Sequence, residues 1–270
     1  MTIMQILFVI LGGIFMPITT ADAAQIFKLE PAQYYFSSKT HLLVTAAMTG
    51  NMSMAQQLVN EGANPNDEGP PESKYNRLRP LHYAIAANNR QAARILMAVG
   101  ADPEMKTEGP GRPLMFAMRL DNMEMLSFLL DLKPIDSLAP DVLKSLVFGA
   151  VDIPRPRCLK LLLERGAPID LEDGARSTIL MAAMDAQDYD LAEWLLLKGA
   201  SVNTEAGGEV TPAYAVEFYL KKFKPGSPTH NKVLHLKEMM KERGAVFPAL
   251  SPAEIRAKRA QLKNQPGDER

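Results

Sequence analysis

The sequence predicts an all-α solenoid built from repeated helix–turn–helix units, and three features indicate this fold. A Gly-Ala marker recurs near multiples of 33 residues, with its glycines at Gly62, Gly100, Gly166, Gly199 and Gly244. An apolar segment that contains a small residue lies about 16 residues before each of the first four markers, and a second apolar segment directly precedes the marker. One such pair of helices cannot bury its apolar side alone, so the units are expected to stack on one another.

The first helices of the units align as six short apolar segments. Five of them share an alanine at the sixth place, and the missing third marker falls at Lys133-Pro134. The six segments are 41–47, 79–85, 112–118, 145–151, 178–184 and 211–217. Pro80, Pro113 and Pro212 suit a first helical turn, where a missing N–H is tolerated. The marker glycines suit the left-handed residue that ends a helix, so the alignment predicts about six repeats.

The aligned units resemble ankyrin repeats, because the family pattern T-P-L-H-x-A appears nearly intact at Arg79–Ala84 and in part at Thr211-Pro212. The resemblance covers roughly residues 38–247 and implies an ankyrin-repeat solenoid with capping ends. We expect an N-terminal cap at 24–37, a repeat domain at 38–250 and a basic C-terminal helix and tail at 251–270. The resemblance also implies that His82 is structural and joins its helix start to the neighbouring loop by hydrogen bonds.

The N-terminal residues are typical of an export signal. A nearly unbroken apolar run from residue 3 to 16 ends at Pro17, and Ala21-Asp22-Ala23 matches a signal-peptidase site. No Lys or Arg precedes the run, which departs from the usual pattern. We expect residues 1–23 to be a cleaved signal peptide; an uncleaved membrane anchor and a buried first helix are the alternatives.

Composition and motifs favour a binding protein over an enzyme. The net charge of −1 argues against nucleic acid as a partner. The single cysteine, Cys158, excludes an intramolecular disulfide framework and a Cys-rich zinc site. No phosphate-binding loop, nucleophile elbow or usefully spaced carboxylate pair is present. We therefore expect no enzymatic activity, no cofactor and no metal; an enzyme whose site shows no motif is the rival interpretation.

Charge is distributed unevenly along the chain. Four long loops, at 67–74, 102–108, 170–176 and 203–209, each carry a net charge of −2, whereas residues 221–270 carry +7. Two interpretations stay open: a solubilising surface, or an acidic edge that selects a basic partner.

The function predicted from these observations is protein–protein interaction by a monomer exported to a bacterial envelope, either periplasmic or secreted. The alternative is a structural scaffold anchored in the inner membrane by residues 1–23. The resemblance implies that a protein partner binds in the ankyrin groove and along the acidic loop edge, with solvent-facing groove residues. The candidate partner-binding residues are Met48, Arg119, Asp152, Asp185, Phe218 and Tyr219.

Overall fold

A computed structural model describes residues 29–69, 77–153 and 155–263. The chain divides into two compact units, Met1–Leu146 (unit 1) and Val147–Arg270 (unit 2), which are described separately. The expected signal peptide and the end of the C-terminal tail lie outside the described residues. Of the helices in the described ranges, none has the length and apolarity needed to cross a membrane.

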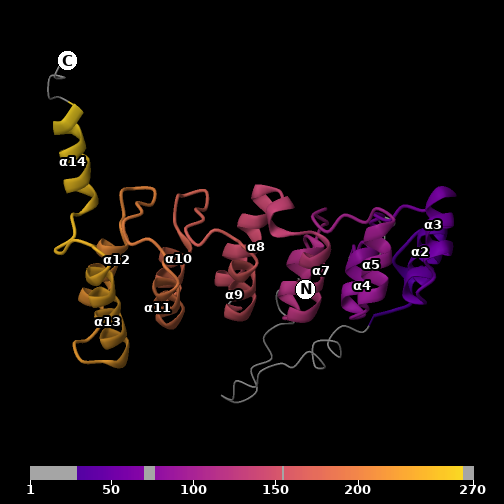
Figure 1. Cartoon of the computed structure of the whole chain (residues 1–270), viewed down its shortest axis with the longest axis horizontal. Coiled ribbons are helices and arrows are strands. Elements are labelled where there is room, and N and C mark those ends of the chain that lie inside the picture. Colours follow the sequence, from indigo (N-terminus) through magenta and orange to yellow (C-terminus); the bar gives the residue numbers. More distant parts are fainter. Residues whose placement is uncertain (1–28, 70–76, 154, 264–270) are drawn as a thin grey trace. The chain divides into compact units, whose positions relative to one another are not determined.

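The described residues of unit 1 form successive helix pairs joined by tight turns (Figure 1). The chain leaves this unit within α8. In order, the elements are η2 (Ala32–Tyr34), α2 (Ser38–Met48), α3 (Met52–Asn60), α4 (Pro80–Ala86), α5 (Arg90–Ala98), α6 (Pro113–Arg119), α7 (Met123–Leu132), η3 (Ile135–Ser137) and α8 (Pro140–Asp152).

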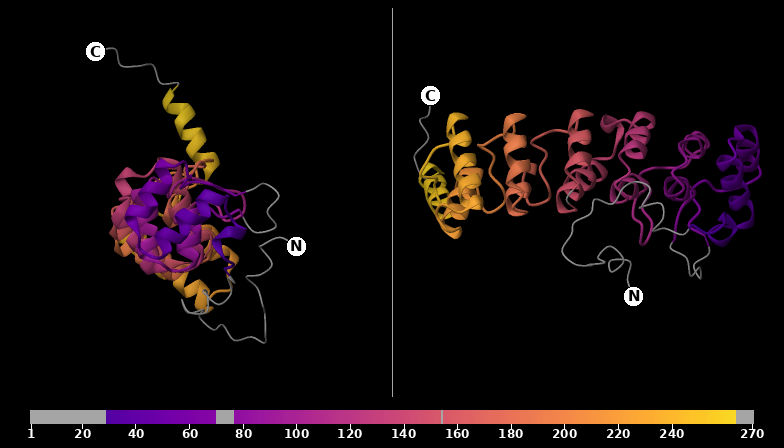
Figure 2. Two further views of the ribbon diagram at one scale, coloured as in Figure 1. Left: turned by 90° about the vertical axis from the view of Figure 1, so that its right-hand side faces the viewer. Right: turned by 90° about the horizontal axis from the view of Figure 1, so that it is seen from below.

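Unit 2 continues the same pattern and adds one terminal helix. The left view of Figure 2 shows that this helix, α14, projects away from the others. The elements are α9 (Pro156–Glu164), α10 (Ile179–Asp185), α11 (Tyr189–Leu197), α12 (Pro212–Lys222), α13 (Pro228–Glu242) and α14 (Pro252–Lys263).

The helix boundaries follow the local signals in the sequence. Three first helices begin at the predicted prolines, Pro80, Pro113 and Pro212. The side chain of Thr211 accepts a hydrogen bond from the backbone N–H of Tyr214 and so caps α12. The five marker glycines all have a positive φ, between 89° and 103°, which an L side chain adopts only with strain.

The core of each unit consists of the apolar residues of the repeated helix pairs. In the first helices, Leu81, Leu114 and Leu180 are buried as predicted, and the small residues Ala84 and Ala117 are completely buried. An alanine at these places lets neighbouring helices approach closely, because it presents only a methyl group. In the expected N-terminal cap, Tyr35 and Phe36 pack their rings against Tyr83 with centroid distances of 5.6 and 5.9 Å, whereas Tyr34 is exposed.

Short hairpins join consecutive repeats. Isolated antiparallel bridges close three of them, between Thr107 and Gly111, Glu172 and Thr178, and Ala206 and Val210. In unit 2 the hairpins at 170–178 and 203–210 are joined by a backbone hydrogen bond from Gly207 to the carbonyl of Ala175 at 2.6 Å. A side chain at position 207 would collide with that carbonyl, so this close approach requires glycine.

Candidate functional site

The six candidate residues lie in both units, at or near the ends of first helices. Asp152, Asp185 and Arg119 are exposed, Met48 is half-buried, and Phe218 is 54% exposed. The structure brings three of the six together, all in unit 2: Asp185, Phe218 and Tyr219. We call these three residues, together with Tyr189 and Phe223, the aromatic cluster.

Tyr219 is not solvent-facing, contrary to the expectation from the sequence. Its side chain is 8% exposed, and its hydroxyl donates a hydrogen bond of 2.8 Å to Oδ1 of Asp185. Its ring stacks on Phe223 and meets Tyr189 edge-on, with centroid distances of 6.2 Å in both cases. Burial, then the hydrogen bond and negative charge of Asp185, raise the pKa of Tyr219 well above its ordinary value. Tyr219 therefore holds Asp185 in place and forms the base of the cluster.

Phe218 is the part of the aromatic cluster that meets solvent. Its ring contacts Tyr219 edge-on at a centroid distance of 5.5 Å. An exposed aromatic ring on a rigid, buried base is a typical anchor for a partner protein, because its contact area requires little ordering on binding. Asp185 beside it supplies an exposed carboxylate that a cationic side chain can approach.

Sequence reasoning missed Tyr189 and Phe223. Tyr189 is buried, with a hydroxyl that has no hydrogen-bond partner in the described structure. Burial and the charge of Asp185 raise its pKa. Tyr189 opens α11 and Phe223 directly follows α12. Both positions lie beyond the seven-residue motif, so its alignment had no way to single them out.

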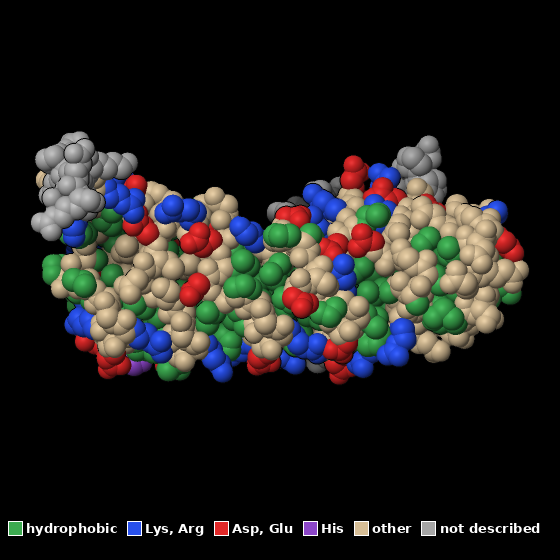
Figure 3. Space-filling model, turned by 45° about the horizontal axis from the view of Figure 1, so that its top comes forward, with side chains coloured by type: hydrophobic (Ala, Val, Ile, Leu, Met, Phe, Trp, Pro, Cys, Tyr) green, Lys and Arg blue, Asp and Glu red, His purple; other side chains and the backbone are tan. Residues whose placement is uncertain are grey.

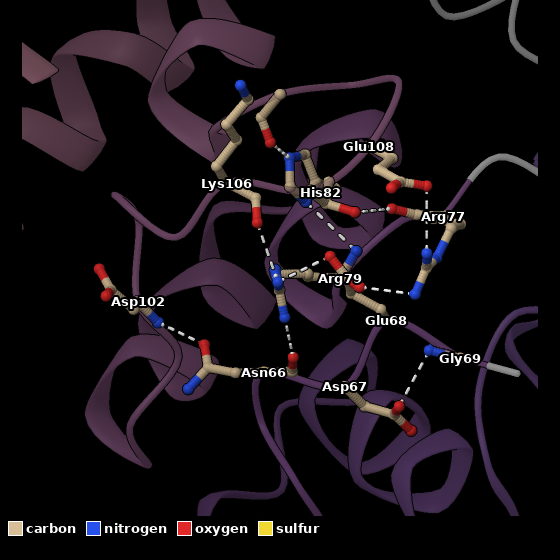
Figure 4. Close-up of polar contacts among 12 residues, drawn as sticks. Asn66, Asp67, Glu68, Gly69, Arg77, Arg79, His82, Asp102, Lys106 and Glu108 are labelled. Atoms are coloured by element: carbon tan, nitrogen blue, oxygen red, sulfur yellow. Dashed lines mark hydrogen bonds and ion pairs between the residues drawn. The ribbon is translucent and has the colours of Figure 1, made fainter. Parts of the chain in front are cut away.

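His82 has the structural role that the resemblance implied. It is completely buried on α4, and its Nδ1 accepts a hydrogen bond from the backbone N–H of Arg79 at 3.2 Å. The other ring nitrogen, Nε2, therefore carries the proton and donates to the carbonyl of Gly111 at 3.2 Å (Figure 4). Burial is the main reason that the pKa of His82 falls to about 3, with the charge of Arg79 acting in the same direction and the bond to Gly111 opposing both. Its uncharged form thus joins a helix start to the next loop.

The same region of unit 1 contains a carboxylate held by two arginines. Glu68 accepts hydrogen bonds of 2.7 Å from both Arg77 and Arg79, one on each oxygen (Figure 4). Arg79 also donates to the carbonyls of Asn66 and Lys106. We call Asn66, Glu68, Arg77, Arg79 and His82 the unit 1 loop network. The charge of Glu68 holds Arg77 and Arg79 within one loop, and Arg79 and His82 fasten that loop to the next one through the carbonyls of Lys106 and Gly111.

Other acidic loop residues also form specific contacts. Asp170 accepts a hydrogen bond from the backbone of Ser201 at 2.8 Å, and Asp173 accepts two from its own loop. Glu104 accepts one from the backbone of Ala139 at 2.8 Å. Figure 3 shows basic side chains interspersed with acidic ones on the face in view. The acidic side chains of these loops thus also form hydrogen bonds that fix the backbone within and between loops.

The structure places the single cysteine of the chain in a helix. Cys158 is completely buried in α9. In the parts of the chain that the structure describes, no group of three or more His, Cys, Asp and Glu side chains is arranged to hold a metal ion.

Comparison with known proteins identifies the repeat family. Residues 22–107 and 43–141 match the family model described as "Ankyrin repeats (3 copies)". No curated protein sequence matches the chain. Among solved structures, the ankyrin repeat domain of Bcl-3, a unique member of the IkappaB protein family, is 22% identical, with 79% of this chain and 90% of that chain covered and a TM-score of 0.56.

Two further solved structures are similar in fold but superimpose less well. The ankyrin repeat domain of human ASB11 is 22% identical over 83% of this chain and 98% of its own, with a TM-score of 0.47. An ankyrin repeat domain from Acinetobacter baumannii AYE is 17% identical over 76% of this chain and 98% of its own, with a TM-score of 0.49.

Ankyrin repeats suggest a protein–protein interaction module, and the fold is generally a non-enzymatic scaffold. Residues 22–141 thus match the ankyrin repeat family, and the described helices have the all-α fold of ankyrin repeat domains.

Proposed function

We propose that this chain is an interaction module that binds a protein partner chiefly through the aromatic cluster of unit 2. The observation that carries the proposal is Phe218, a large ring 54% exposed to solvent and seated on the buried ring of Tyr219. Binding energy in protein interfaces concentrates in a few such aromatic anchors. Phe218 buries its exposed surface in an apolar pocket of the partner.

The partner presents a cationic side chain next to that pocket. Asp185 is exposed, and the hydroxyl of Tyr219 holds its carboxylate at 2.8 Å in a defined orientation. A lysine or arginine of the partner would pair with Asp185 at the rim of the interface, while Asp152 and the acidic loops act mainly on the rate of association. Met48 and Arg119, which lie in unit 1, are proposed as further contacts.

The proposed compartment is a bacterial envelope, where the chain acts as a monomer in the periplasm or after secretion. The support for this part of the proposal is the apolar run and Ala21-Asp22-Ala23 triplet of the sequence. Intact-mass analysis of the exported protein should then find a chain that begins at Ala24. A full-length species extracted only with detergent would instead support the alternative, a scaffold anchored by residues 1–23.

Surface plasmon resonance tests the binding site once a pull-down from the host has supplied a partner. We expect Phe218→Ala to weaken binding by at least about fivefold, equivalent to about 1 kcal/mol. Leu197→Ala is the matched control, because Leu197 is an apolar side chain of unit 2 that is 64% exposed and lies on α11. Asp185→Asn should slow association, most clearly at low salt. Unchanged binding by Phe218→Ala would remove the aromatic cluster from the interface.

A further inference from the structure

The terminal helix α14 presents two arginines to two glutamates of the last acidic loop. Arg256 donates to Oε2 of Glu209 at 2.8 Å, and Arg259 donates to Oε2 of Glu205 at 2.7 Å. Arg259 also lies 3.8 Å from the other oxygen of Glu209. Residues three apart share one face of a helix. A single face of α14 therefore contacts the loop at 203–209.

The segment before α14 is fastened to the repeats, which directs the helix toward this loop. Glu217 on α12 accepts hydrogen bonds from the backbone of Ala249 at 3.0 Å and from the ammonium of Lys237 at 2.9 Å. The same ammonium lies 4.7 Å from the ring centroid of Phe247. Ser251 and Glu254 form a reciprocal capping box that starts the helix.

Charge rather than core packing holds α14. The preceding helix, α13, buries Val233, Leu236 and Met240, whereas no side chain between 251 and 261 is buried. The arginines stay about half exposed, at 57% and 51%, but the two glutamates are only 23% and 21% exposed. Exposed ion pairs contribute about 0.2–1 kcal/mol each and weaken with salt. The helix thus covers the glutamates without being firmly attached to them.

The contact between α14 and the loop leaves one oxygen of Glu205 without a hydrogen bond. Oε1 of Glu205 is buried without a hydrogen-bond partner, although a carboxylate can accept from both nitrogens of one guanidinium. An unpaired buried acceptor is costly, so an arginine that engages both oxygens of Glu205 would bind this loop better than α14 does.

We propose that α14 is an autoinhibitory segment that occupies the surface of the loop at 203–209. When α14 leaves, this surface binds a helix of the partner that carries two arginines three residues apart. This inference deepens the proposed function and rests on it for the basic character of the partner. In the free chain the short tether keeps α14 at a high effective concentration, on the order of millimolar, near the loop. A partner helix that pairs with both oxygens of Glu205 displaces α14 and takes its place on Glu205 and Glu209.

Hydrogen–deuterium exchange of the full chain tests the occupancy of the loop without any partner. At low salt, Arg256→Ala combined with Arg259→Ala should speed amide exchange in α14 about fivefold, because an isolated helix of this length is marginal. Glu205→Gln combined with Glu209→Gln should have the same effect from the other side of the contact. Lys258→Ala is the matched control, since Lys258 lies between the two arginines and forms no ion pair with the described residues. Unchanged exchange in both double variants would overturn the contact.

A labelled synthetic peptide of residues 251–263 tests the ligand class by fluorescence anisotropy. The Arg256→Ala and Arg259→Ala chain should bind this peptide about fivefold more tightly than the unmodified chain, in which α14 competes. Adding the two glutamine substitutions to that chain should abolish binding. A double variant that binds the peptide no better than the unmodified chain would overturn autoinhibition. Both measurements use neither Phe218 nor a partner protein, so a failure here is distinct from a failure of the proposed function.

Discussion

The unit 1 loop network pairs one glutamate with two arginines, and the last acidic loop of unit 2 pairs two glutamates with two arginines, but the arginines come from different places. In unit 1, Arg77 and Arg79 belong to the repeat itself, and Arg79 directly precedes α4. In unit 2, Arg256 and Arg259 come from α14, a helix outside the predicted repeats. Arg79 has a side chain only 12% exposed, whereas that of Arg256 is 57% exposed. The first arrangement is part of the fold; the second can open without loss of the core.

The largest expected effect comes from removing an arginine of the repeat. Arg79→Ala should lower the free energy of unfolding by about 2–4 kcal/mol, because it leaves Oε1 of Glu68 and two backbone carbonyls of a mostly buried network without their donor. Urea denaturation followed by circular dichroism measures this loss. A cost below about 0.5 kcal/mol would mean that the two arrangements do not differ as described.

The protonation of His82 should produce the next effect, a pH dependence that the α14 contact does not share. The folded-state pKa of about 3 lies below the ordinary 6.5, so the unfolded chain binds the proton first as the pH falls. Stability from this group is complete above pH 6.5 and is lost as the pH falls toward 3, by about 2 kcal/mol at pH 5. Urea denaturation at pH 7 and pH 5 should show this loss in the unmodified chain. His82→Ala should be less stable at pH 7 by about 1–2 kcal/mol but should lack this contribution to the pH dependence; an equal pH dependence in both chains would contradict the assignment.

A smaller loss of stability is expected in unit 2 when Asp185 loses the hydroxyl that donates to its carboxylate. Tyr219→Phe removes the hydroxyl that donates to Asp185 and should cost about 1 kcal/mol of stability. Thermal denaturation of this variant and of Phe218→Ala compares the contributions of Tyr219 and Phe218 to stability. If Phe218→Ala cost more stability than Tyr219→Phe, Phe218 would be a structural residue rather than an exposed anchor.

The smallest expected effect is on the α14 contact. Arg256→Ala together with Arg259→Ala should lower the free energy of unfolding of the repeats by no more than about 1 kcal/mol, since half-exposed ion pairs contribute little. Differential scanning calorimetry of the double variant and the unmodified chain measures this difference. A loss as large as that of Arg79→Ala would show that α14 is an integral part of unit 2.

The structural role of His82 could be predicted from the sequence because it depends on the place of the residue within one short motif. The residue follows Pro80 and Leu81 at a fixed place in a repeated motif, and the other units place Val44, Met115 or Tyr214 there. Helix starts at the prolines and helix ends at the marker glycines are local in the same way, because each depends on the backbone preference of one residue.

The candidate site could be predicted only in part. Alignment of the repeats selected Asp185, Phe218 and Tyr219 by their place after the motif, but it treated all three as solvent-facing. The burial of Tyr219 depends on Phe223, four residues further along the same repeat, and on Tyr189. Tyr189 opens α11 of the preceding repeat and meets Tyr219 only when the two repeats stack. That contact is a property of packing, so no spacing within one repeat encodes it.

The sequence by itself determined the repeat, its length, its helix boundaries and the residues of its core, because each follows from periodic burial and from the backbone preferences of proline and glycine. Only the tertiary structure decided which charges meet. Glu68 lies nine residues from Arg77, whereas Glu205 lies 54 residues from Arg259. The loops look equivalent in net charge, yet their partners differ because electrostatic pairing depends on distance in space. Folding sets that distance: it places repeat arginines beside Glu68 and an appended helix beside Glu205.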